Sequence, residues 1–454
     1  MSENQERQNS IEKNDLTQGE IVRKLIAFFL PVAAGTIFQQ LYNAVDGMVV
    51  SKFVGTAALA AVGGSSANII NVLVGFFVAM TNGAAIIISH LFGAKDDEGL
   101  SRAVNASFAL CGVFSVIIMA IGIPLTPAFL RWMKTPADTM AGSTTYLRIY
   151  FCGVLFSLIF NMGSGILRSV GDSKRPFYYL MACCGLNIVL DLAFVVLFKM
   201  GVAGVAIATV AAQVLSAALV MIRMCKPGNS YKVTLKKMKL DKEYVPRMLR
   251  VGVPAGLQNS MYSVSNMLLQ VAVNSLGTTV VAGWFLTGKI DGFYWSTINA
   301  AGVAVMAFVG QNYGARKYDR VRETNKKGLI VFGLMSIAFS VLIMSIGRPA
   351  LAIFTDDTGV LDIAVLVLRF FAPTYVIWCV NEVLTGTMRG CGDAMVPTVI
   401  SGLCICLFRV LWILLVFPHM RNIMGISICY PVSWVVMMIP LIIRYKRGKW
   451  LKTE

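Results

Sequence analysis

The sequence predicts an all-α polytopic membrane protein, with twelve transmembrane helices in two six-helix lobes related by pseudo-twofold symmetry. Three observations predict this fold class: an apolar composition, long stretches without charge, and an internal repeat. Hydrophobic residues make up 57% of the 454 residues and charged residues only 14%, against about 25% charged in ordinary soluble proteins. A spanning helix needs roughly 20 apolar residues, and no Asp, Glu, Lys or Arg occurs in segments 53–94, 103–130, 200–222, 251–288 and 422–443.

Twelve helices follow from these apolar stretches and from the charged and proline residues between them. Those of the first half are expected at 24–50, 57–92, 102–126, 140–168, 176–199 and 201–223. Those of the second half are expected at 248–275, 280–312, 326–346, 360–388, 396–417 and 424–444. Pro176 and Pro397 suit the first turns of the fifth and eleventh helices, because an N–H at that position has no partner within the helix.

The two halves of the chain repeat one another. “LRSVGDSKRP” (167–176) and “MRGCGDAMVP” (388–397) share Arg, Gly, Asp and Pro in register, 221 residues apart. The same offset relates “FGAK” to “YGAR” and “YLRIYF” to “VLRFFA”, and an offset of 222 relates “VGTAALA” to “LGTTVVA”. Four matches at a near-constant offset indicate an internal repeat. Six helices return the chain to its starting side, so the repeats are parallel and related by an axis along the membrane normal.

The repeat and the polar stretches divide the chain into five segments. We expect a cytoplasmic N-terminal segment at 1–23, an N-lobe at 24–223, a basic cytoplasmic linker at 224–247, a C-lobe at 248–445 and a cytoplasmic tail at 446–454.

The distribution of the net charge of +17 indicates how the chain is oriented in the membrane, and it requires no nucleic-acid partner. Of the 40 Lys and Arg residues, 30 lie in segments on one side of the predicted spans and six lie on the other. By the positive-inside rule, this bias predicts that both termini are cytoplasmic in a multi-pass protein of the cell inner (cytoplasmic) membrane. Residues 1–20 are polar and lack an apolar core, so we expect no cleaved signal peptide. The ten cysteines lie mostly in spans and form no CxxC pair, which predicts packing rather than a metal site, a disulfide framework or a cofactor.

Two intramembrane carboxylates occur in one half only. Asp46 should correspond to about Leu268 in the second half, and Asp191 to about Trp412. A carboxylate needed only to fold a six-helix unit would be expected in both halves. The asymmetry therefore predicts chemistry located in the first lobe.

The two aspartates are expected to meet. By residue counting, Asp46 lies in the outer half of the first helix and Asp191 in the outer half of the fifth, while Asn187 shares a face with Asp191. Like charges in a low dielectric cannot both ionise freely. Such a pair can take up a proton or hold a small hard cation with amide and hydroxyl oxygens. The alternative is that each carboxylate is hydrogen-bonded to packing neighbours, but ionisable groups inside membranes mark functional sites by default.

The segments “LYNAVDGMVVSKFVG”, “LRSVGDSKRP” with the following “NIVLDLAF”, and “RGCGDAMVP” resemble those of the Multidrug And Toxic compound Extrusion (MATE) family. The resemblance covers the chain from about residue 16 to 445 and implies the twelve-helix, two-lobe layout. It also implies antiport, with a drug or metabolite moving out and protons or sodium moving in. It implies a cation-coupling site formed by Asp46, Asn187, Asp191 and Thr209, and a supporting hydrogen-bond network that includes Tyr42 and Asn161.

The chain departs from the family pattern in two places. Another branch carries an acidic residue on the seventh helix, but here that helix reads “PAGLQNSMYSVSNM”, so we do not expect a C-lobe cation site of that kind. The proline that often follows the fifth-helix aspartate is replaced by Leu192 and Ala193, which predicts a straighter helix.

The second half has intramembrane charges of its own. Lys289 and Asp291 are two residues apart, and we expect them in a structural charge network near the outer surface. Glu382 lies seven residues before Arg389 and replaces Asn161 in the repeat register. It is a candidate for binding a cationic substrate or relaying protons.

These observations predict a secondary active multidrug efflux antiporter that exports organic, cationic compounds in exchange for H⁺ or Na⁺, with Na⁺ held at Asp46 and Asp191. We expect a monomer in the lipid bilayer, since six helices per lobe can form a cleft within one chain. The alternatives are a flippase of a lipid-linked cell-envelope precursor, or an exporter of one specific metabolite. An enzyme is not expected, because His90 and His419 lie on different helices and opposite sides and no nucleophile or metal constellation is evident. No GxxxxGK[ST] nucleotide-binding loop occurs either.

Overall fold

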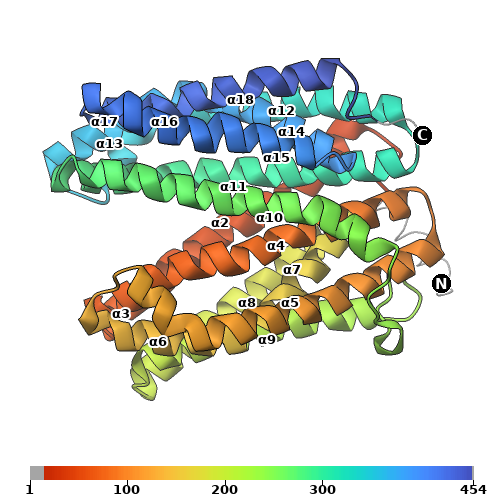
Figure 1. The fold of residues 1–454 in the computed structure, drawn as a ribbon, viewed down its shortest axis with the longest axis horizontal. Coiled ribbons are helices and arrows are strands. Elements are labelled where there is room, and N and C mark those ends of the chain that lie inside the picture. The colour runs from red at the N-terminus through yellow and green to blue at the C-terminus, as the bar shows by residue number, and fades with distance from the viewer. Residues whose placement is uncertain (1–14, 452–454) are drawn as a thin grey trace. The chain divides into compact units, whose positions relative to one another are not determined.

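The computed structural model of the protein describes residues 15–451, which are helical throughout apart from turns and loops (Figure 1). The helices before the linker are α2 (Ile21–Phe53), α3 (Thr56–Gly63), α4 (Ser65–Gly93), α5 (Asp97–Trp132), α6 (Ala137–Cys152), α7 (Val154–Ser169), α8 (Lys174–Leu192) and α9 (Gly201–Cys225). Those after it are α10 (Tyr244–Asn274), α11 (Thr278–Gly314), α12 (Tyr318–Ala352), α13 (Thr358–Phe371), α14 (Tyr375–Gly390), α15 (Met395–Ser401), α16 (Phe408–Leu415), α17 (Ile423–Ser427) and α18 (Cys429–Lys446).

Within residues 15–451, ten helical stretches are long and apolar enough to cross a membrane, and the bent pair α6–α7 makes an eleventh. The seventh expected span is present as α10, a helix of 31 residues. It is not among the strongly apolar stretches, because it carries amides and hydroxyls, such as Gln258, Asn259 and Ser260, on successive residues. With α10, the helices account for the twelve spans predicted from the sequence.

Several expected helices are interrupted rather than continuous. The fourth, expected at 140–168, is bent by 52° between α6 and α7, where Gly153 separates the two segments. The second breaks at Gly64, and the tenth breaks at the 3₁₀ turn Ala372–Thr374. Gly64 has a non-helical backbone conformation, with φ −85° and ψ −116°, and Pro373 removes a hydrogen-bond donor from the tenth helix. An apolar run continues across such breaks, so hydropathy alone does not reveal them.

The chain forms two compact units, and the boundaries between them lie within helices. Of the described residues, the first unit comprises 15–16 and Ala34–Gly256, and the second comprises Thr17–Ala33 and 257–451. Helix α2 therefore contributes to both units, and so does α10. Each helix contains a proline close to the boundary between the units, Pro31 in α2 and Pro254 in α10. The exact lobe boundaries given above stay a prediction.

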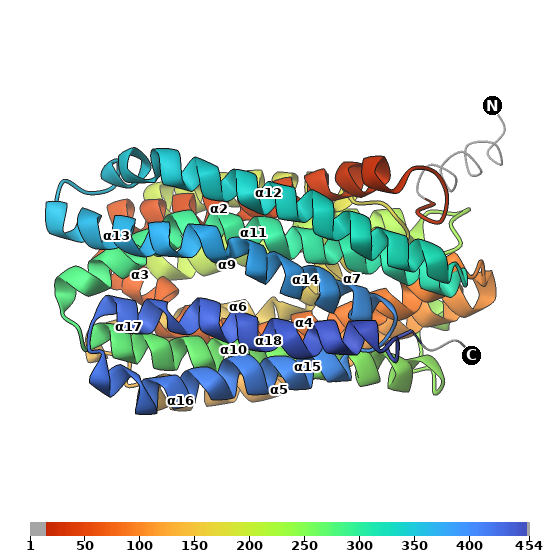
Figure 2. The same ribbon diagram turned by 90° about the horizontal axis from the view of Figure 1, so that it is seen from above.

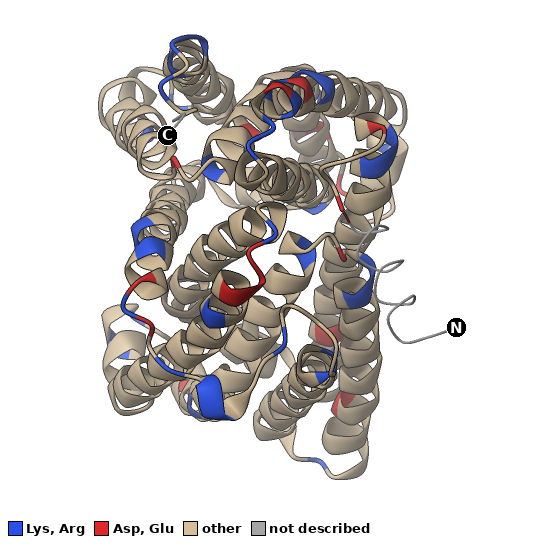
Figure 3. Ribbon diagram, turned by 90° about the vertical axis from the view of Figure 1, so that its right-hand side faces the viewer, with Lys and Arg blue, Asp and Glu red and all other residues tan. Residues whose placement is uncertain are grey.

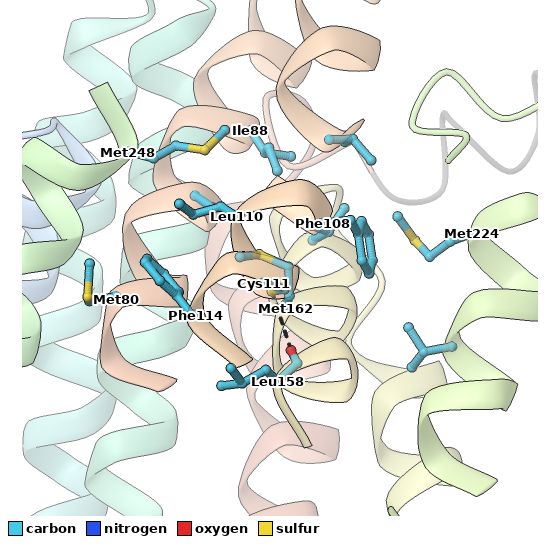
Figure 4. Packing of buried hydrophobic residues seen from close by; sticks show 14 of the residues in the cluster. Met80, Ile88, Phe108, Leu110, Cys111, Phe114, Leu158, Met162, Met224 and Met248 are labelled. Atoms are coloured by element: carbon cyan, nitrogen blue, oxygen red, sulfur yellow. Dashed lines mark hydrogen bonds between the residues drawn. The ribbon is translucent and has the colours of Figure 1, made fainter. Parts of the chain in front are cut away.

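The core of the first unit is a large cluster of apolar side chains from α4, α5, α7, α9 and the start of α10 (Figure 4). Ile88, Cys111, Leu158 and Met224 are fully buried in it. Cys111 Sγ points toward the Leu158 carbonyl oxygen at 3.8 Å, so this thiol is used in packing α5 against α7. This cluster holds in place the helices that carry the polar groups described below.

Glycines let helices of this unit approach each other closely. A Cβ added at Gly83 of α4 would lie 2.3 Å from the Met248 carbonyl oxygen and 2.6 Å from the Gly252 nitrogen of α10. Atoms do not approach this closely without displacement, so the contact requires glycine. Small residues at helix contacts are the usual basis of association in membranes, where lipid tails remove the hydrophobic driving force.

The second unit is built around α11, α12 and α14, which run side by side in Figure 2. Large aromatic side chains fill its interior, including Trp434, Tyr294 and Tyr375, which are almost fully buried. The first part of α2 belongs to this unit, where Phe29 makes an edge contact with Phe332 at 5.1 Å between ring centroids.

Candidate cation-coupling site

The first unit contains two carboxylates that approach each other. Asp46 lies in the last third of α2 and is half-buried, and Asp191 lies in the last turn of α8 and is only 1% exposed. Their carboxyl groups lie within reach of a side-chain hydrogen bond to each other. The meeting expected from the sequence is therefore present in the structure.

The carboxylate pair lacks donors. Among the described residues, Asp46 Oδ1 and both Asp191 oxygens are buried and have no hydrogen-bond donor. Two ionised carboxylates cannot donate to each other, and an uncompensated charge in a low dielectric is costly. A shared proton or a bound cation would supply the missing interaction for these three oxygens.

Asn187 lies one turn before Asp191 on the same face of α8 and is also buried. Its Oδ1 accepts a hydrogen bond from the hydroxyl of Tyr42, which lies one turn before Asp46 on α2. Asn187 Nδ2 is buried without an acceptor in the described part of the chain. The Tyr42 bond thus ties the two aspartate-bearing helices together directly beside the pair.

Thr209 of α9 completes the predicted set. Its hydroxyl donates to the Val205 carbonyl oxygen at 2.9 Å and is within side-chain hydrogen-bond reach of Tyr146. Tyr146, on α6, is buried and close enough to interact electrostatically with both Asp46 and Asp191. Thr209 thus lies beside Tyr146 and, among the described residues, forms no direct bond to either carboxylate.

Sequence reasoning missed the tyrosines of α6. Tyr146 stacks on Tyr150 with ring centroids 6.2 Å apart, and the Tyr150 hydroxyl reaches Gln213 and Ser157. The repeat contained a signal for both residues, because “YLRIYF” aligns with “VLRFFA”, which has no hydroxyls at these positions. The asymmetry that singled out the two aspartates applies equally to these tyrosines.

Asn161 lies at the edge of this network. Its Nδ2 donates to the Ser157 carbonyl oxygen one turn back on α7, at 2.8 Å. Since the Ser157 side chain reaches Tyr150, Asn161 is connected to the site through two intervening residues. The structure does not bring it into direct contact with the aspartates.

Helix α8 departs from α-helical geometry directly after Asp191. The α-helix ends at Leu192, and a π-helical turn follows at Ala193–Leu197. π-Helical turns inside helices are frequent at functional sites. The absence of proline predicts a straighter helix here. The structure instead interrupts the α-helix with this π-helical turn, at the place where the proline would follow the aspartate.

The charged residues of the second unit are used differently. Asp291 of α11 accepts hydrogen bonds from Trp295 Nε1 at 2.6 Å and from the Tyr375 hydroxyl at 2.5 Å. Tyr375 stacks on Tyr294 at 3.9 Å, which places this carboxylate among aromatic rings. Lys289 Nζ lies 4.6 Å from the centroid of the Phe285 ring and forms no ion pair with Asp291. Asp291 thus has the donors that the first-unit aspartates lack.

Glu382 packs on α14 against Gly302 of α11, where an added Cβ would lie 2.1 Å from Glu382 Oε1. Arg389, two turns later, donates to Gln258 Oε1 of α10. The Arg389 guanidinium is thus engaged by an amide, and Glu382 stays a candidate for substrate binding or proton relay.

Comparison with known proteins identifies the family. The MatE family model matches residues 31–193 and 254–415, which is most of the chain in two segments, as the repeat predicts. The “Probable multidrug resistance protein YpnP” of Bacillus subtilis (strain 168) is 29% identical over 445 residues, covering 96% of this chain and 97% of that protein. YoeA of the same organism, also named a “Probable multidrug resistance protein”, is 28% identical over 441 residues, with 95% of each chain covered. The “Multidrug export protein MepA” of Staphylococcus aureus (strain N315) is 21% identical over 383 residues, with 84% of each covered.

Solved structures show the same fold. One described as “Outward-facing conformation of a multidrug resistance MATE family transporter of the MOP superfamily” has a TM-score of 0.88 at 22% identity, covering 97% of this chain and 99% of that one. Another, from Pyrococcus furiosus Vc1 (DSM3638), has a TM-score of 0.87 at 22% identity, covering 97% and 99%. The predicted fold class and the family resemblance are both confirmed, and the protein is a transporter rather than an enzyme. The chain belongs to the MatE family of multidrug efflux transporters.

Proposed function

We propose that this protein is a secondary antiporter that exports organic cations in exchange for H⁺ or Na⁺ bound by Asp46 and Asp191. The observation that carries the proposal is the set of three buried carboxylate oxygens without donors. The relatives named as multidrug export and resistance proteins support the substrate class.

In this proposal each residue of the site has a distinct part. The oxygens of Asp46 and Asp191 hold the proton or cation. Tyr42 holds the Asn187 amide beside the pair, and Tyr146 connects the pair to Thr209. A hydroxyl and amide shell of this kind orients the charged groups and keeps them at a fixed separation.

Coupling between drug and cation follows from the difference between the cation-free and the cation-bound states of the Asp46–Asp191 pair. Binding of one proton or Na⁺ leaves the pair with one negative charge instead of two and relieves the repulsion, which changes the preferred packing of α2, α8 and α9. The π-helical turn after Asp191 provides a place where α8 can adjust. Transport requires that the drug bind the cation-free state more tightly than the cation-bound state, since a ligand with equal affinity for both shifts nothing.

We also propose that the protein is a monomer of the cell inner membrane with cytoplasmic termini. The unequal distribution of Lys and Arg between the two sides supports this orientation. The N-terminal residues themselves lie outside the described part of the chain.

The proposal is tested with purified protein in proteoliposomes loaded with ethidium, a fluorescent organic cation. A pH gradient and a Na⁺ gradient are imposed in separate experiments. We expect one gradient to drive ethidium efflux and the other to leave it at the level of protein-free liposomes. Addition of an ionophore that dissipates the active gradient should stop the efflux. Efflux driven by neither gradient would show that antiport of organic cations is wrong.

A further inference from the structure

The segment between α9 and α10, residues 226–243, is folded onto the first unit rather than loosely tethered. Its Val233 N–H donates to the Met224 carbonyl oxygen at 2.9 Å. The Thr234 N–H donates to Asn105 Oδ1 on α5 at 2.8 Å, and Asn105 Nδ2 donates back to the Lys232 carbonyl oxygen at 3.4 Å. Asn105 is buried, so this part of the segment has a fixed position on α5.

The far end of the segment is anchored by an ion-pair cluster. Arg102 of α5 bonds both oxygens of Asp241 at 3.0 and 3.2 Å and reaches Glu243 at 3.0 Å. Asp241 Oδ1 also accepts the N–H groups of Glu243 and Tyr244, where α10 begins. Burial opposes ionisation, but these bonds outweigh it and hold the pKa of the Asp241 carboxyl below its usual range. Asp241 is therefore buried against the protein, and the exposed Glu243 is paired with Arg102.

The opposite face of the segment is basic and apolar. Lys236, Lys237 and Lys239 are exposed and form no ion pair with a described residue. They are flanked by Leu235, which is 74% exposed, and Leu240, which is 51% exposed. We call these five residues the linker face. It lies in the green loop at the right of Figure 1, on the side that faces the viewer in Figure 3.

The register on α5 places the linker face at the level where the membrane begins. Arg102 is the last charged residue before the uncharged run 103–130, and Asn105 lies three residues further along. At 1.5 Å per residue, Asn105 is about 4.5 Å beyond Arg102 along the helix axis. Thr234 is bonded to Asn105, so the adjacent Leu235 lies beside the start of the apolar stretch, where water gives way to lipid.

We propose that the linker face binds the anionic surface of the lipid bilayer. Lysines interact with anionic headgroups within the screening distance of the membrane surface, and exposed leucines at this depth enter the boundary between headgroups and acyl chains. A free phosphate could pair with the lysines but would leave both leucines in water, so a bilayer matches the whole face. This inference does not depend on the transported compound or the coupling ion.

The test is hydrogen–deuterium exchange of the full-length protein in nanodiscs of phosphatidylcholine alone and in nanodiscs that also contain phosphatidylglycerol. In the anionic nanodiscs, we expect exchange of peptides covering residues 232–243 to be slower by roughly tenfold or more, since each lysine near an anionic surface favours binding by about fivefold. The variant Lys236→Gln/Lys237→Gln/Lys239→Gln should lose this difference. The matched control Lys446→Gln/Arg447→Gln/Lys449→Gln removes three positive charges after and at the end of α18 and should retain it.

Three results would overturn the proposal. The first is equal exchange of these peptides in the two kinds of nanodisc. The second is an equal loss in the control variant, which would make the effect one of bulk charge. The third is equal slowing by inorganic phosphate in neutral nanodiscs, which would make the face a phosphate site. Unchanged exchange around Asn105 in the triple variant would show that the segment is still folded on α5, so that a lost difference reports lipid binding.

Discussion

Asp191→Asn is expected to abolish gradient-driven efflux while leaving the folded protein intact. Both Asp191 oxygens are buried without donors, and an asparagine can donate a hydrogen bond to Asp46 permanently, as a bound proton would. The pair would then carry a single negative charge permanently, as it does with one proton bound. Coupling free energies are typically about 1–3 kcal/mol, or roughly 5–150-fold in affinity, so we expect ethidium efflux by the variant to fall to the level without a gradient. The measurement is initial efflux rate from proteoliposomes with the active gradient.

Asp291→Asn is the matched control for that experiment. It removes a half-buried carboxylate from a spanning helix as well, but both oxygens of Asp291 already have donors, Trp295 and Tyr375. We expect it to retain ethidium efflux driven by the ion gradient. Equal loss of efflux in the two variants, at equal expression and thermal stability, would mean that any buried carboxylate is needed and that the Asp46–Asp191 pair has no special part.

Gly83→Ala is expected to be among the most destabilising single-methyl additions in the first unit. The new Cβ would lie 2.3 Å from the Met248 carbonyl oxygen and 2.6 Å from the Gly252 nitrogen. Overpacking typically costs about 1–3 kcal/mol, and here the obstructing atoms are backbone atoms that cannot rotate away. We therefore expect a cost of about 3 kcal/mol or more, seen as a fall of several degrees in the apparent Tm in detergent.

Gly112→Ala provides the comparison for this substitution. Gly112 lies within α5, and an added Cβ there meets no heavy atom within 4 Å. Because alanine favours helix over glycine by roughly 0.5–1 kcal/mol, this variant should keep or slightly raise the apparent Tm. A Gly83→Ala protein as stable as Gly112→Ala would show that α4 and α10 are not packed through Gly83.

The sequence was sufficient for the spans but not for their breaks. Segments without charged residues indicate the spans directly, because a charge inside the hydrocarbon of the bilayer is costly. The repeat then predicted six helices in each half of the chain. The bend at Gly153 and the π-helical turn after Asp191 were not predictable, because both lie inside apolar runs whose hydropathy is unchanged by them. Helix α10 was found by its place in the repeat and by its lack of charge, although its amides make it less apolar than the other spans.

The candidate site was predictable where the two halves disagree. Asp46 and Asp191 are unmatched in the second half, and a carboxylate in a span is conspicuous among apolar residues. Tyr146 was missed because a tyrosine in a membrane helix is ordinary, and its importance comes from tertiary packing that brings α6 to the pair. Asn161 stays a predicted member of the supporting network, and its side-chain amide bonds to the Ser157 carbonyl oxygen rather than to an aspartate.

The central claim is that drug binding and cation binding at Asp46 and Asp191 are energetically linked. It is tested most directly by the affinity of purified protein for ethidium, followed by fluorescence anisotropy while Na⁺ is varied at fixed pH and pH is varied at fixed Na⁺. For the wild type, we expect one cation to lower the affinity by roughly 5–150-fold, and the Asp46→Asn/Asp191→Asn double variant should bind ethidium with an affinity that neither cation changes. A wild-type affinity independent of both cations, or a double variant with the full wild-type dependence, would contradict the account.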